Sequence, residues 1–67
     1  MIAISLNGQQ HALDDETSVT QLLQHLGYAG KRVAVEKNGE IVPKSQHAQT
    51  RMAEGDRLEI VVAVGGG

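Results

Sequence analysis

Sixty-seven residues without cysteine, tryptophan or phenylalanine form at most one small domain, whose core must be built from Ile, Val and Leu. So short a chain leaves little interior for an enclosed active site, and the lack of cysteine excludes disulfides, thiolate metal sites and a nucleophilic thiol. The net charge of −2, the scattered Lys and Arg, and an amino terminus unlike a signal peptide predict a cytoplasmic protein that binds neither nucleic acid nor membrane.

A β-hairpin is predicted at the beginning of the chain. Apolar residues alternate with smaller ones over residues 2–6, and the pair Asn7 and Gly8 follows at once. Both residues tolerate a positive φ, which the tightest hairpin turns require. The chain is therefore expected to return as a second strand over residues 9–13.

A short amphipathic helix is predicted next. Ser18 and Gln21 have the spacing of a capping box, so the helix begins at Val19, and Gly27 supplies a left-handed stop. Its apolar stripe has helical spacing and comprises Val19, Leu22, Leu23 and Leu26. We expect Leu22, Leu23 and Leu26 to be buried against Ile4, Val33, Val35 and Ile60.

The second half of the chain predicts a second hairpin and a final strand. Asn38 and Gly39 repeat the turn signal within residues 32–42, and residues 44–53 have the pattern of an irregular loop with a helical turn. A tight turn over residues 54–56 then leads into the last strand. One face of that strand carries Leu58, Ile60, Val62 and Val64, while Val61 and Ala63 are apolar on the other.

This order of elements predicts an α+β fold of the ubiquitin-like β-grasp type, a mixed sheet of four to five strands packed on one helix. A right-handed crossover lets the last strand lie parallel to the first, and its apolar character favours a central position. The β-grasp domain should span residues 1–64 and be followed by a flexible tail over residues 65–67. On the face opposite the helix, a partner surface is expected from Ala3, Ala34, Val61 and Ala63.

The three histidines predict no metal or catalytic site. His11, His25 and His47 fall on a strand, a helix and a loop without clustered spacing, so we expect them to be solvated. Phosphate-binding glycine loops are also absent from the sequence. No cofactor is expected to bind this chain.

The glycine tail is the one segment that local structure does not explain. Gly65, Gly66 and Gly67 follow a strongly apolar strand, and a linker would account for their flexibility. As a functional segment, glycines without Cβ atoms could thread a narrow channel and leave the last carbonyl unhindered. A carboxylate there would react only after activation, for example as an acyl-adenylate made from ATP by another protein.

The sequence resembles the small ubiquitin-like sulfur carriers of thiamine biosynthesis, the ThiS family. The resemblance covers the helix at 18–26, "VAVEKNGEIVP" from Val33 to Pro43, "EGDRLEIV" from Glu54 to Val61, and a final Gly-Gly. The family pattern has two glycines, so either Gly65 precedes the pair or Gly67 follows it.

The resemblance implies a protein co-substrate and not an enzyme. A ubiquitin-activating-type adenylyltransferase would use ATP to adenylate the Gly67 carboxylate, with Gly65 and Gly66 threading into that partner. Sulfur from a cysteine desulfurase persulfide would then displace AMP, and thiazole synthase would consume the resulting thiocarboxylate. Two alternatives remain open: the sulfur carrier subunit of molybdopterin synthase, and a β-grasp protein-binding module with an inert tail.

Overall fold

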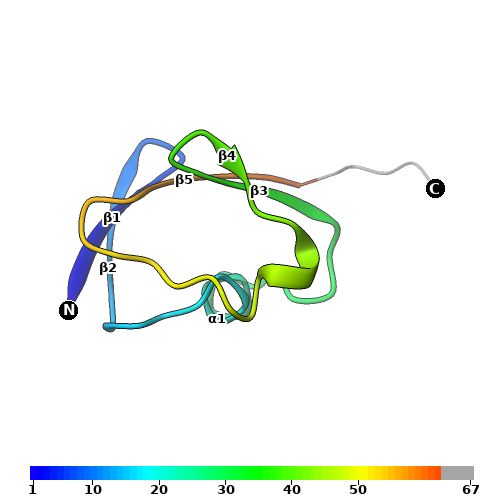
Figure 1. Cartoon of the computed structure of the whole chain (residues 1–67), viewed down its shortest axis with the longest axis horizontal. Helices are drawn as coiled ribbons and strands as arrows, with labels where there is room; N and C mark the ends of the chain where they lie inside the picture. The colour runs from blue at the N-terminus through cyan, green and yellow to red at the C-terminus, as the bar shows by residue number, and fades with distance from the viewer. Residues whose placement is uncertain (63–67) are drawn as a thin grey trace.

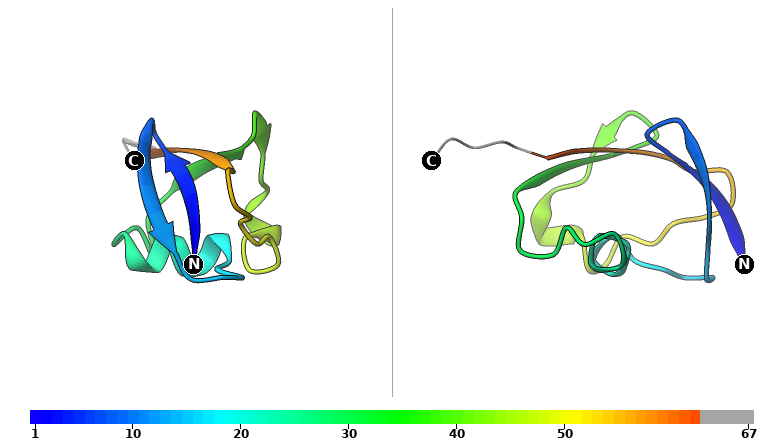
Figure 2. Two further views of the ribbon diagram at one scale, coloured as in Figure 1. Left: turned by 90° about the vertical axis from the view of Figure 1, so that its left-hand side faces the viewer. Right: turned by 180° about the vertical axis from the view of Figure 1, so that it is seen from behind.

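The computed structural model describes residues 1–62 and confirms the predicted order of elements. A mixed five-stranded sheet has the order β2-β1-β5-β3-β4, and a single helix, α1, lies against one face (Figures 1 and 2). The elements are β1 (Ile2–Leu6), β2 (Gln9–Leu13), α1 (Val19–His25), β3 (Val33–Lys37), β4 (Glu40–Ile41), the 3₁₀ helix η1 (Lys44–Gln46) and β5 (Arg57–Val62).

The two Asn-Gly pairs form the predicted hairpin turns. Asn7 and Gly8 have φ values of 49° and 84°, and Asn38 and Gly39 have values of 53° and 86°. Positive φ at both central residues is the geometry whose twist matches that of the flanking strands. Antiparallel pairing of β1 with β2, and of β3 with β4, follows directly from these turns.

The helix begins as the capping box predicts. The Gln21 backbone N–H donates to Ser18 Oγ at 3.1 Å, and the Ser18 backbone N–H donates to Gln21 Oε1 at 2.9 Å. The helix ends at His25, and Gly27 has the expected positive φ of 83°. Seven residues span only about 10 Å, so the helix covers the sheet for barely two turns.

The core lies between α1 and the sheet, and its composition corrects one prediction. Leu22 and Leu23 are buried as expected, but Leu26 is only partly buried, as is Val33. Leu26 is the C-cap, one position beyond a very short helix, and Val33 is the first residue of β3, so both lie at the rim of the core. The fully buried side chains are Ile4, Val19, Leu22, Val35 and Leu58.

The last strand has the central position that its apolar sequence predicts. It pairs parallel to β1 from Ser5–Arg57 onward and antiparallel to β3 up to Val33–Val62. The predicted continuation of this strand through Ala63 and Val64 lies outside the described residues. Within residues 1–62, no helix is long and apolar enough to cross a membrane.

Candidate functional site

The candidate site is organised around β5, because this strand leads directly into the glycine segment. Leu58 and Ile60 anchor the strand in the core, while Val61 and Val62 are exposed. β5 runs along the sheet toward the end of the domain where β3 begins (Figure 1). The chain therefore reaches one end of the domain along the central strand of the sheet.

The side chain of Asn7 holds β5 beyond the end of the β1 ladder. Asn7 Oδ1 accepts from the Ile60 backbone N–H at 2.9 Å, and its Nδ2 donates to the Ile60 carbonyl at 3.2 Å. The Asn7 backbone N–H also donates to the Leu58 carbonyl at 2.9 Å. Asn7 thus supplies the hydrogen bonds that a further residue of β1 would otherwise make with the strand.

Asn38, in the equivalent turn of the second hairpin, holds the beginning of the same strand. Its Oδ1 accepts from the Arg57 backbone N–H at 2.8 Å, and its Nδ2 donates to Asp56 Oδ1 at 3.0 Å. Partial burial by itself would raise the pKa of Asp56, but hydrogen bonds from the Ala53 N–H and Asn38, together with the Lys37 ammonium, lower it below its ordinary value. The ionised carboxylate therefore fixes the turn that leads into β5.

Replacing Asn7 with glycine isolates the contribution of its side chain. Asn7→Gly keeps the positive φ of the turn but removes both amide hydrogen bonds to Ile60. We expect a loss of about 1 to 3 kcal/mol in the free energy of unfolding, measured by chemical denaturation. The control Gln10→Gly alters an exposed residue of β2 that makes no such bonds. An Asn7→Gly midpoint equal to that of wild type would contradict the stabilising role of the Asn7 side chain.

The structure brings together two of the four residues expected to form a partner surface. Ala34 and Val61 are directly opposite on β3 and β5, and both are exposed, Val61 by 63%. Ala3 lies at the other end of the sheet, where its carbonyl accepts from the Gly55 N–H at 2.8 Å. Arg57 to Val61 alone spans about 13 Å of strand, so Ala3 cannot belong to the same patch. Ala63 lies outside the described residues.

One histidine departs from the sequence-based expectation. His25 is exposed and His11 partly so, but His47 is buried, with 7% of its surface exposed. His47 follows η1, and its Nε2 lies 3.1 Å from the Val42 carbonyl. The helical turn of η1 directs the His47 side chain inward. Residues 44–53 have no clear hydrophobic period, so the sequence does not predict this burial.

The described part of the chain holds no group of three or more His, Asp or Glu side chains placed to bind a metal ion. The glycines expected to act chemically, Gly65, Gly66 and Gly67, lie outside the described residues. The sequence predicts the two asparagines that fix β5 only as turn residues. Their Asn-Gly pairs show that each side chain sits at a sharp turn, but not which distant strand it reaches.

The fold defined by this strand order, with one helix on one face of the sheet, is that of a ubiquitin-like β-grasp protein. A family model described as the ThiS family matches residues 4–67, and the chain belongs to that family. The crystal structure of a thiamine biosynthesis protein (ThiS) from Geobacter metallireducens is similar, with a TM-score of 0.83 and 32% identity. The alignment covers 98% of this chain and 100% of that one.

Two curated relatives are much longer proteins. A thiazole synthase of Paramagnetospirillum magneticum is 47% identical over 62 residues, which are 92% of this chain and 19% of that protein. A thiazole synthase of Magnetococcus marinus is 38% identical over 64 residues, which are 96% of this chain and 20% of that protein. The chain thus spans about a fifth of the length of these relatives.

Proposed function

We propose that this chain is a sulfur carrier of thiamine biosynthesis, acting as a protein co-substrate and not as a catalyst. The observation that carries the proposal is the match to the ThiS family, which extends through Gly67 and therefore includes the glycine segment. The similar structure is named a thiamine biosynthesis protein, and the longer relatives are named thiazole synthases. These names favour the thiamine pathway over the molybdopterin pathway.

The proposed chemistry takes place at the Gly67 carboxylate. A ubiquitin-activating-type adenylyltransferase joins this carboxylate to the AMP part of ATP and releases pyrophosphate. The persulfide of a cysteine desulfurase then displaces AMP and forms an acyl disulfide with the chain. A second thiol, such as that of cysteine, reduces this bond, becomes part of a disulfide with the desulfurase, and releases the thiocarboxylate that thiazole synthase consumes. Gly65 and Gly66 let the segment enter a narrow channel, because a Cβ atom would widen the chain and restrict its torsions.

The geometry of β5 supports the delivery of such a segment to a partner. The core side chains Leu58 and Ile60, together with the side chains of Asn7 and Asn38, fix the strand from Arg57 to Ile60. A partner that recognises the sheet therefore meets the end of β5 in a defined place. Because β5 is already ordered up to this point, binding there has a lower entropic cost.

We further propose that the exposed pair Ala34 and Val61 is part of the surface that these partners contact. Val61→Asp places a charge on this pair, and we expect about a tenfold weaker complex with the adenylyltransferase, since desolvating a carboxylate in an apolar interface is unfavourable. Isothermal titration calorimetry would measure the affinity. The matched control is Ala12→Asp, which adds the same charge at an exposed position of β2. Equal affinities for wild type and Val61→Asp would place the interface elsewhere.

The proposed function is tested by isotope exchange between pyrophosphate and ATP. The adenylyltransferase should catalyse this exchange only when the chain supplies the carboxylate that accepts AMP. Exchange should therefore rise with the concentration of the chain and saturate. The test uses the adenylyltransferase encoded in the same genome. If the chain does not stimulate its exchange of pyrophosphate with ATP, the proposal is contradicted.

A further inference from the structure

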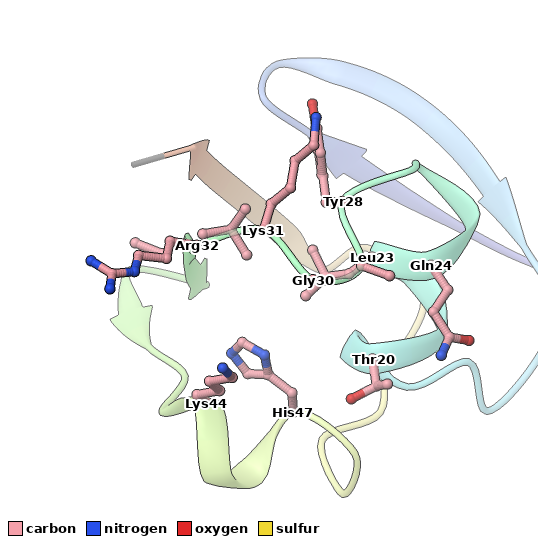
Figure 3. A pocket seen from close by; sticks show the side chains of 12 residues that line it. Thr20, Leu23, Gln24, Tyr28, Gly30, Lys31, Arg32, Lys44 and His47 are labelled. Carbon is pink, nitrogen blue, oxygen red and sulfur yellow. The ribbon is translucent and has the colours of Figure 1, made fainter. Parts of the chain in front are cut away.

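A cavity of about 610 Å³ opens between the second half of α1, the loop that follows it and η1 (Figure 3). Its apolar wall comes from Leu23, Tyr28 and Val33. Its polar rim carries the exposed side chains of Lys31, Arg32 and Lys44. Figure 3 shows Arg32 and Lys44 on the side of the cavity away from the helix, and Lys31 between them and the helix.

The charge around this cavity is opposite to that of the chain as a whole. The chain carries a net charge of −2, yet three of its six Lys and Arg residues line the cavity and none of its eight Asp and Glu residues does. Lys37 and Arg51 form ion pairs, with Asp56 and Glu16 respectively. Within residues 1–62, the three cations of the rim have no such partner. The rim is therefore complementary to an acidic ligand.

The cavity lies beside the end of β5, the strand that precedes the glycine segment in the sequence. Val33 lines the cavity and pairs with Val62 at the end of β5, and Ala34 belongs both to the cavity lining and to the exposed pair with Val61. The loop that follows α1 lies under this end of the sheet, and so does η1 (Figures 1 and 2). A protein that takes up the glycine segment would therefore approach the end of the domain at which the cavity opens, while Val61 itself is on the other face of the sheet.

We propose that this cavity binds an acidic segment of thiazole synthase that carries an apolar anchor residue; this inference rests on the proposed function. The anchor contacts Leu23, Tyr28 and Val33, while neighbouring carboxylates pair with the cationic rim. Two relatives of this chain are named thiazole synthases and contain a similar segment, so in those proteins this kind of domain is part of the same polypeptide as that enzyme. The cavity supplies a specific docking site for it.

A protein segment suits the cavity better than a small anion. Small-molecule sites orient their ligand with fixed, convergent polar groups. The buried polar side chain here is His47, and its Nε2 is already engaged by the Val42 carbonyl at 3.1 Å. The charges of the rim are on the long, exposed side chains of Lys31, Arg32 and Lys44. An apolar centre with a polar rim is the arrangement of a protein interface.

The test compares two double variants that lower the net charge equally. Arg32→Gln/Lys44→Gln removes two charges from the rim, whereas Gln9→Glu/Gln10→Glu adds two acidic charges to exposed positions of β2. By isothermal titration calorimetry at low salt, the rim variant should bind thiazole synthase about tenfold more weakly, and the difference should shrink as salt is added. The β2 variant should bind within about twofold of wild type.

Three outcomes would overturn this docking site: wild-type affinity of the rim variant for thiazole synthase, an equal loss for the β2 variant, or a loss confined to the adenylyltransferase. ATP or inorganic pyrophosphate alone shifting the amide resonances of Arg32 and Lys44 would instead indicate a small-anion site and also overturn it. Isotope exchange by the wild-type chain reports separately on the proposed function. If the wild-type chain supports exchange while the rim variant binds thiazole synthase with wild-type affinity, the docking site is wrong but the proposed function stands.

Discussion

Leu22→Ala is expected to destabilise the domain by about 2 to 5 kcal/mol, most of the stability that a core of this size supplies. Leu22 is 1% exposed and belongs to the single core cluster between α1 and the sheet. Truncation leaves a cavity that a helix of two turns cannot close by shifting, because its ends are fixed by the capping box and by Gly27. Chemical denaturation followed by circular dichroism would measure the change.

The same substitution at Leu26 provides the matched control. Leu26 is on the same stripe, one helical turn later, but is only partly buried at the C-cap. Leu26→Ala should therefore cost clearly less than Leu22→Ala. If Leu22→Ala leaves too little folded protein to measure, Leu22→Val is the smaller truncation for the comparison. Equal losses at the two positions would contradict the described packing of α1.

Gly66→Val is expected to abolish activation of the chain while leaving its stability unchanged. The branched Cβ restricts the backbone torsions and widens the segment where the proposed channel is narrow, although the terminal charge is kept. Deleting Gly66 and Gly67 should have the same effect on activation. Pyrophosphate exchange with the adenylyltransferase would measure activation, and melting temperatures would establish that the fold is intact.

Ser45→Val provides the control for this prediction, because it introduces the same side chain at an exposed position of η1. Its exchange activity should equal that of wild type. Full exchange activity of the chain without Gly66 and Gly67 would identify the glycines as an inert tail. The alternative hypothesis, that the chain is a β-grasp protein-binding module, would then be favoured.

Local signals in the sequence were sufficient to predict most of the fold. The Asn-Gly turns, the capping box of Ser18 and Gln21, and the stop at Gly27 each depend on the torsions or hydrogen bonds of a few neighbouring residues. The apolar character of the last strand likewise predicted its central position. In each case the structure is set by interactions over short stretches of chain, or by the apolar side chains of a strand that pairs along both edges.

The features that could not be predicted depend on contacts between distant residues. Asn7 reaches Ile60 and Asn38 reaches Arg57, and the composition of a turn does not identify these partners. His47 is buried because η1 turns it inward, and Ala3 is separated from Val61 by the offset between β1 and β5. The cationic cavity combines side chains from the loop after α1 and from η1. Neither segment has a strand or helix period, so the sequence pattern does not predict that these side chains lie together.

The most direct test of the sulfur-carrier proposal is the intact mass of the chain after incubation with ATP, the adenylyltransferase, a cysteine desulfurase and cysteine. The proposal predicts a mass increase equal to the replacement of one oxygen by sulfur, and fragmentation should place the change on the carboxyl-terminal glycine. The increase should require ATP and be absent from Gly66→Val. An unchanged mass under conditions where the desulfurase forms its persulfide would contradict the proposal.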